Sequence, residues 1–110
     1  MQNPESENHG GQSPRLLIVD DKVENLIGLE KILADLDVDF VRALSGDEAL
    51  ASVMEHDFAL ILMDVQMPVM DGFETAELIR SDGKSKHIPI VFVTAISRDQ
   101  RYIFKGYASG

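Results

Sequence analysis

The stretch LLIVDD, residues 16–21, decides the fold class of this chain. Four aliphatic residues in succession stop abruptly at two aspartates. A run that is apolar at every position suits a strand that is buried on both faces of a parallel sheet. The stretches ALILMD (residues 59–64) and IVFVT (residues 90–94) repeat this pattern. We therefore predict three interior strands, each with a polar residue at its carboxyl end.

Between and after these strands, apolar residues recur at spacings of three and four, which is typical of amphipathic helices. In chain order, the predicted inward faces are Leu26, Leu29, Leu33 and Leu36; Ala49, Leu50, Val53 and Met54; Phe73, Ala76 and Ile79; and Ile103, Phe104 and Tyr107. Asp71 is suited to cap the third helix. The fourth is expected to begin near Ser97, although Gly106 disfavours it. Residues 38–44 form a more polar strand, which we place at the sheet edge.

The predicted order is β-α-β-α-β-α-β-α, which indicates a doubly wound parallel sheet with helices on both faces. Residues 1–14 contain Gly, Ser, Asn and Pro but no large aliphatic residue after Met1. We expect this segment to be a disordered lead-in. Residues 15–110 are expected to form one domain.

Composition narrows the classes of partner. The chain has 110 residues, with 19 acidic and 10 basic side chains and a net charge of −9. This balance argues against direct binding to nucleic acid or to an anionic membrane. The absence of cysteine excludes disulfides and thiolate metal sites. No apolar run approaches the roughly 20 residues that span a bilayer, and the N-terminus is unlike a signal peptide. We expect a cytoplasmic protein.

The polar residues that end the three apolar strands are the main functional signal. Ligands of doubly wound sheets bind at the carboxyl ends of the strands. There Asp20 and Asp21 should meet Asp64, with Thr94 nearby. Clustered carboxylates repel one another unless a cation intervenes, and Mg²⁺ suits such oxygen ligands. Asp64 lies centrally and could act as a nucleophile toward a phosphoryl group, which Thr94 could contact. Taken singly, each could instead be a solvated turn or helix-cap residue.

Three segments together resemble the motifs of response-regulator receiver domains. Residues 60–72 (LILMDVQMPVMDG) resemble the phosphoacceptor motif, residues 16–21 the acidic pair, and residues 91–95 (VFVTA) the threonine strand. The separation between Asp64 and Thr94 also matches, at 94 − 64 = 30 positions. The resemblance covers residues 15–110 and implies a flavodoxin-like fold with strand order 2-1-3-4.

The resemblance also implies roles for individual residues. Asp64 would be the phosphorylation site, and Thr94 would contact the phosphoryl group and act as the switch. Asp21 and Asp64 would bind Mg²⁺ through their side chains, Asp20 mainly through water, and Gln66 through its backbone carbonyl. Mn²⁺ is expected to substitute for Mg²⁺. The expected phosphodonor is a sensor histidine kinase or a histidine phosphotransfer domain, and an effector domain of unknown type is expected in the parent protein.

One departure from the family pattern concerns the C-terminal end. Receiver domains have a fifth strand, a fifth helix and, at the end of that strand, a lysine that contacts the phosphoryl group. We expect this chain to be C-terminally truncated and to lack all three. The chain contains five lysines, and Lys22, Lys84, Lys86 and Lys105 do not stand where the family has this lysine. The apolar edge of residues 90–93 would then lie open, which favours dimerisation or an element swap.

Two other functions remain open. The first is a Mg²⁺-dependent phosphohydrolase of the haloacid-dehalogenase type, which also uses an aspartate nucleophile. Gln66 stands where such enzymes have a second acid, two positions after the nucleophile. The second is a protein-interaction module that has lost phosphorylation. The receiver hypothesis predicts no turnover of an external substrate, because any phosphoryl transfer would be to and from the domain itself.

Overall fold

The computed structural model describes the backbone of residues 13–96 and 101–107, and the side chains of residues 13–93. Five strands form one sheet in the order β2-β1-β3-β4-β5. The elements, in chain order, are β1 (Arg15–Val19), α2 (Val23–Ile32), β2 (Asp39–Ala43), α3 (Gly46–Glu55), β3 (Leu60–Asp64), α4 (Gly72–Ser81), β4 (Ile90–Ile96) and β5 (Arg101–Tyr107). The predicted lead-in, residues 1–14, falls almost wholly outside the described part.

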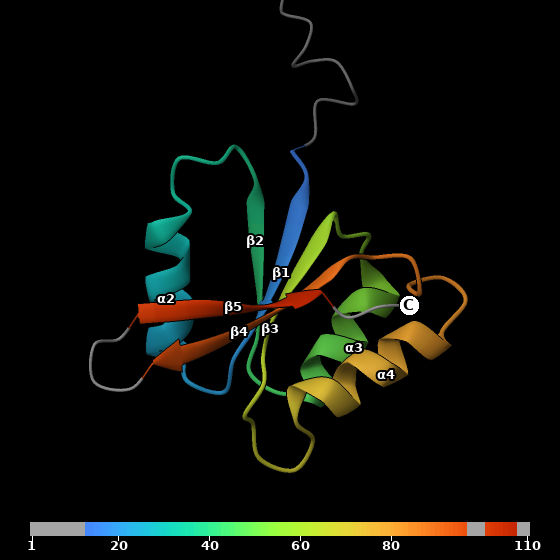
Figure 1. Ribbon diagram of the computed structural model, residues 1–110. Coiled ribbons are helices and arrows are strands. Elements are labelled where there is room, and N and C mark those ends of the chain that lie inside the picture. The colour runs from blue at the N-terminus through green and yellow to red at the C-terminus, as the bar shows by residue number, and fades with distance from the viewer. Residues whose placement is uncertain (1–12, 97–100, 108–110) are drawn as a thin grey trace, which may run out of the picture.

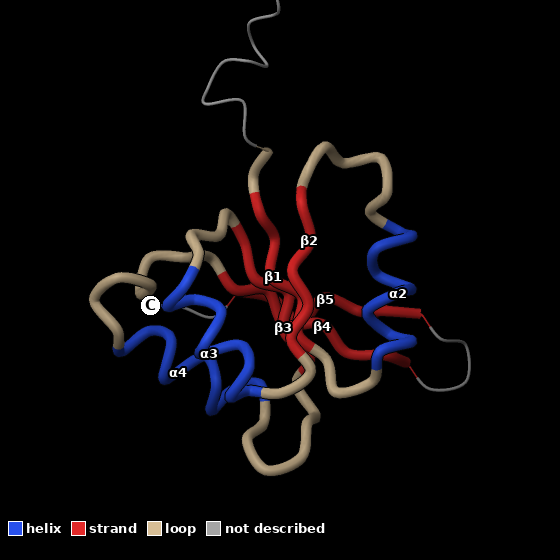
Figure 2. The backbone as a smooth tube through the Cα atoms, turned by 180° about the vertical axis from the view of Figure 1, so that it is seen from behind, coloured by secondary structure: helices blue, strands red, loops and turns tan. Residues whose placement is uncertain are grey.

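The first four strands are parallel, which confirms the predicted order 2-1-3-4. Helix α2 lies on one face of the sheet, and α3 and α4 lie together on the other (Figures 1 and 2). The predicted polar edge strand is β2. No helix in the described residues is long and apolar enough to cross a membrane.

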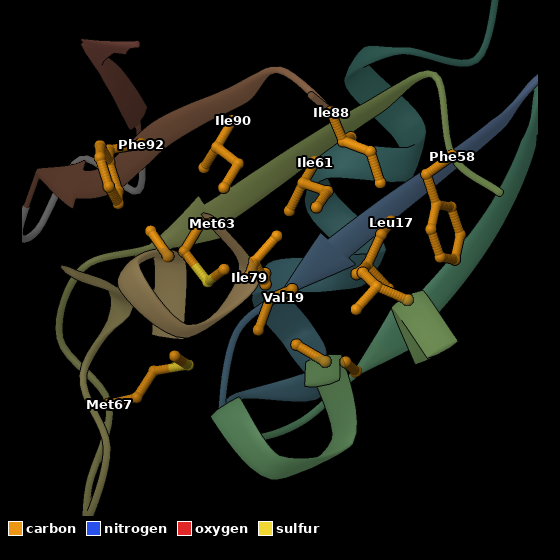
Figure 3. Close-up of a cluster of buried hydrophobic side chains, with 14 residues drawn as sticks. Leu17, Val19, Phe58, Ile61, Met63, Met67, Ile79, Ile88, Ile90 and Phe92 are labelled. Atoms are coloured by element: carbon orange, nitrogen blue, oxygen red, sulfur yellow. The ribbon is translucent and has the colours of Figure 1, made fainter. Parts of the chain in front are cut away.

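The larger part of the core lies between the sheet and the α3–α4 face. Leu17, Val19, Ile61 and Met63 point into it from the two central strands (Figure 3). A smaller cluster, which includes Ile18, Leu26 and Leu62, lies under α2 on the other face. Side chains of β1 and β3 therefore bury alternately on both faces, as the continuous apolar runs predict.

The predicted fourth helix is wrong. Residues 101–107 form β5, which pairs antiparallel with β4, while Ser97 lies outside the described residues. If β4 were the last strand of the sheet, one row of its backbone N–H and C=O groups would lack hydrogen-bond partners. The pairing with β5 supplies these partners. The segment RYIFKGY is also rich in residues that favour strands. The edge of β4 is therefore covered. Because β5 is antiparallel to β4, it lies outside the parallel order 2-1-3-4 that the resemblance predicts.

Some residues predicted to face inward are exposed. Helix α2 ends at Ile32, and the chain then tightens into turns, so Leu36 is 50% exposed. Met54 and Phe73 are also exposed. The ring of Phe73 packs against Phe92 on β4, with 4.6 Å between the ring centroids. Of the remaining inward residues of α3 and α4, Ala49, Val53, Ala76 and Ile79 are buried as predicted, whereas Leu50 is partly buried.

Candidate phosphoacceptor and metal site

The parallel register brings the predicted acids to one edge of the sheet. Val19 on β1 pairs with Met63 on β3, so Asp20 and Asp64 lie side by side one position further on. One carboxylate oxygen from each of Asp20, Asp21 and Asp64 lies within 4.8 Å of the other two. The predicted convergence of these three side chains is therefore present.

Asp20 is the most buried of the three acids and is held by hydrogen bonds. It is 3% exposed. The backbone N–H of Lys22 donates to its Oδ1 over 2.9 Å. The side-chain amide of Asn25 donates to both oxygens, at 3.3 Å from Oδ1 and 3.1 Å from Oδ2. Burial raises the pKa of Asp20, and these hydrogen bonds oppose the rise.

Asn25 is a site residue that the sequence reasoning missed. It lies in the first turn of α2, five positions after Asp20. Its amide orients the Asp20 carboxylate by donating to both of its oxygens. The sequence feature that could have identified Asn25 is its position: it has an amide side chain and lies one helical turn after Asp21, at the start of the helix that follows β1.

Asp64 is partly buried, and its pKa is strongly raised. Burial, and then the negative charges of Asp20 and Asp21, raise its pKa to about 7. Backbone N–H groups of Gln66 and Val65 hydrogen-bond to it and oppose this rise. Among the described ion pairs, the site has one cation, the exposed Lys22, whose Nζ lies 4.0 Å from Asp21. The three carboxylates therefore carry more negative charge than Lys22 neutralises.

These donors fit a hard divalent cation. Two ligands on opposite sides of Mg²⁺ lie about 4.2 Å apart, twice the Mg–O distance of about 2.1 Å. The three carboxylate oxygens lie no more than 4.8 Å from one another, so small side-chain movements would bring them around one ion. Carboxylate oxygens are also the ligands that Mg²⁺ prefers. The predicted role of the Gln66 backbone carbonyl stays a prediction.

Thr94 is placed at the same edge by its backbone. Val93 on β4 is the register partner of Asp64, so Thr94 follows directly beyond it. The Thr94 side chain lies outside the described part of the chain, and its contact with a phosphoryl group stays a prediction.

The loop after Asp64 is closely packed against the start of α4. The Gly72 N–H donates to the Val65 carbonyl over 2.9 Å. A Cβ atom at Gly72 would collide with the Asp64 carbonyl oxygen. Asp71 and Glu74 form a capping box, which fixes the start of α4. The absence of a side chain at Gly72 therefore permits the close approach of the α4 start to the backbone of Asp64.

Val69, at the tip of this loop, has a strained backbone. Its φ is 71°, and the Met70 N–H donates to the Pro68 carbonyl over 2.7 Å across it. A β-branched residue is disfavoured in this region, and the side chain is fully exposed.

Val69→Asn should raise the free energy of unfolding by about 1 kcal/mol, because asparagine tolerates positive φ. Urea unfolding would measure this. Val69→Ile is the control and should bring no gain; equal effects of the two substitutions would contradict the strain.

Comparison with known proteins agrees with this geometry. Residues 16–110 match the response regulator receiver domain family. The chain belongs to this family. Receiver domains are modules of two-component signalling, and their fold is the one described above.

Relatives and solved structures give the extent of the similarity. The chain is 38% identical over 87 residues to the sensor histidine kinase GacS of Pseudomonas protegens, which covers 76% of this chain but 10% of that kinase. Chemotaxis response regulator CheY4 of Vibrio cholerae superimposes with a TM-score of 0.70 at 32% identity, covering 78% of this chain and 72% of CheY4. Response regulator TrrA of Thermotoga maritima, in complex with Mg²⁺-BeF, gives 0.68 at 32% identity, covering 76% and 71%.

Proposed function

We propose that this receiver domain accepts a phosphoryl group on Asp64 in a Mg²⁺-dependent reaction, from a phosphohistidine of a sensor kinase or phosphotransfer domain. The observation that carries the proposal is the convergence of Asp20, Asp21 and Asp64 at the carboxyl end of the sheet. Similarity to a receiver region of a sensor histidine kinase supports the type of partner. Similarity to a regulator in complex with Mg²⁺-BeF supports the cation.

In the proposed reaction, an oxygen of Asp64 attacks phosphorus while the P–N bond of phosphohistidine breaks. The leaving imidazole keeps the electron pair of that bond, and Asp64 becomes an acyl phosphate. Asp20, Asp21 and Asp64 would hold Mg²⁺, which when bound supplies positive charge for the phosphoryl oxygens. Asp64 must be ionised to attack, and a raised pKa disfavours this form. Thr94 would contact the transferred group. We expect this chemistry in the cytoplasm, without turnover of an external substrate.

The proposal is tested by incubating the chain with labelled acetyl phosphate. Wild type with Mg²⁺ should take up label at one site, and Asp64→Asn should take up none, because its amide is not a nucleophile. Chelation of the metal should also suppress labelling. Asp39→Asn, the same change at an exposed position of β2, is the matched control and should label normally. Equal labelling of Asp64→Asn and Asp39→Asn would overturn the proposal.

Asn25 should contribute to metal affinity by holding Asp20. Asn25→Ala is expected to weaken Mg²⁺ binding about tenfold, the usual lower limit for the loss of a group that orients a metal ligand. Titration of the metal followed by NMR, without a phosphodonor, would measure this. The adjacent change Glu24→Gln, at an exposed position of α2, should leave the affinity unchanged. If both variants bind Mg²⁺ as wild type does, Asn25 has no such role.

A further inference from the structure

Helices α3 and α4 leave an apolar groove open between them on their outer side. The two helices lie side by side on one face of the sheet (Figures 1 and 2). The groove has a volume of about 240 Å³ and is lined by Leu50, Val53, Met54, Leu78, Ile79, Asp82 and Ser85. Val53 and Ile79 are buried at its base, whereas Met54 is 69% exposed and Leu78 is 46% exposed. The groove shares no residue with the acidic site.

The helices that form this groove are acidic. Helix α3 contains three acids and no basic residue. Helix α4 contains two acids and Arg80, whose guanidinium donates to the Lys86 carbonyl. Asp47 lies three positions before Leu50, and Glu74 lies four positions before Leu78, so each acid shares a helix face with a groove residue. All of these acids are exposed, as is Asp82 in the groove itself. Lys84 also lies at the groove, because its Nζ donates to the Met54 carbonyl over 3.2 Å, so the nearby acids outnumber this cation.

We propose that this groove is a docking site for a basic amphipathic helix of a partner protein. An apolar groove between two helices accepts the apolar stripe of a third helix. Exposed methionine adapts readily to the shape of a bound side chain. The acids along the groove would pair with lysine or arginine at the edges of such a stripe. A second copy of this chain would instead bring a net charge of −9 and the same acids, so self-association is disfavoured.

The test uses a short fluorescent helical peptide of leucine and lysine, with its leucines on one face. We expect saturable binding to the 110-residue chain, with NMR shift changes confined to α3, α4 and residues 82–85. Met54→Lys with Leu78→Lys should weaken binding about tenfold or more, because both apolar contacts are lost. The control Ile32→Lys replaces a side chain that is 63% exposed on α2, on the other face of the sheet, and should have no effect.

Charge is tested separately. Glu77 is exposed on α4 and lies three positions after Glu74, beside Leu78. Asp47→Asn with Glu77→Gln removes two exposed acids, and should weaken binding and reduce its dependence on salt. A peptide with glutamate in place of lysine should not bind. Equal affinity for the two peptides would overturn the proposal. So would unchanged binding by the Met54 and Leu78 double variant with its fold confirmed by circular dichroism, or self-association of the chain through this groove.

Discussion

Asp64→Asn is expected to stabilise the metal-free domain by about 1–2 kcal/mol at pH 8, although it removes the proposed phosphoacceptor. The pKa of Asp64 is raised to about 7 in the folded protein, so ionising it costs folding free energy. The full shift would correspond to about 4 kcal/mol. Because the side chain is partly exposed, solvent screening reduces this to the smaller value. Asparagine at this position carries no charge and avoids the cost.

The sign of the pH dependence follows from the raised pKa. Between about pH 4 and pH 7 the folded state binds more protons at Asp64 than the unfolded state does, so the stability of the wild type falls as pH rises. The advantage of Asp64→Asn should therefore be absent near pH 4, grow up to pH 7 and then level off. Urea unfolding in the presence of a chelator, at several pH values, would measure it. Asp39→Asn should show no such trend, and a constant advantage for Asp64→Asn at every pH would contradict the account.

Added Mg²⁺ should reverse the order of stability. A ligand that binds only the folded state stabilises it in proportion to the logarithm of its concentration over Kd. Wild type has all three carboxylates of the site, whereas Asp64→Asn has two. At saturating Mg²⁺ and pH 8, wild type should gain more stability than the variant.

Gly72→Ala is expected to destabilise the domain by about 2–3 kcal/mol and to weaken the site at the same time. The new Cβ would meet the backbone of Asp64 and lie 3.0 Å from Val65 Cα. Backbone atoms cannot rotate away as a flexible side chain can, so the start of α4 or the end of β3 must shift. The shift would move the Asp64 carboxylate relative to Asp20 and Asp21. Denaturant unfolding and Mg²⁺ titration would measure the two effects.

Gly83→Ala is the matched control for Gly72→Ala, because a Cβ there meets nothing within 4 Å. It should change neither the free energy of unfolding by as much as Gly72→Ala does nor the Mg²⁺ affinity. If Gly72→Ala behaves in the same way, the close approach of α4 to Asp64 does not constrain the site.

The sheet and its acidic edge were predictable because they depend on short-range patterns. Residues 16–19 are apolar at every position, which requires burial on both faces and places the strand inside a parallel sheet. Parallel strands end at the same edge, so Asp20 and Asp64 had to converge. Both inferences need only the order of residues along each strand, and not the direction of any side chain.

The features that were missed depend on contacts distant in sequence or on side-chain direction. The apolar residues of 101–107 are spaced as in a helix, yet this segment forms a strand because it pairs with the free edge of β4. The spacing of residues within the segment does not show that this edge needs a partner. The exposure of Met54 follows from the distance between α3 and α4, which spacing along one helix does not contain. Asn25 reaches Asp20 because of the angle at which α2 leaves β1.

The most direct test of the central claim is to locate the phosphoryl group. The chain would be treated with acetyl phosphate and Mg²⁺, and the acyl phosphate would then be reduced with borohydride, which converts a phosphorylated aspartate to homoserine. Mass spectrometry of the peptides would identify the modified residue. The account predicts homoserine at Asp64, and none when Mg²⁺ is chelated. Homoserine at a different residue, or unmodified Asp64 in the presence of Mg²⁺, would contradict it.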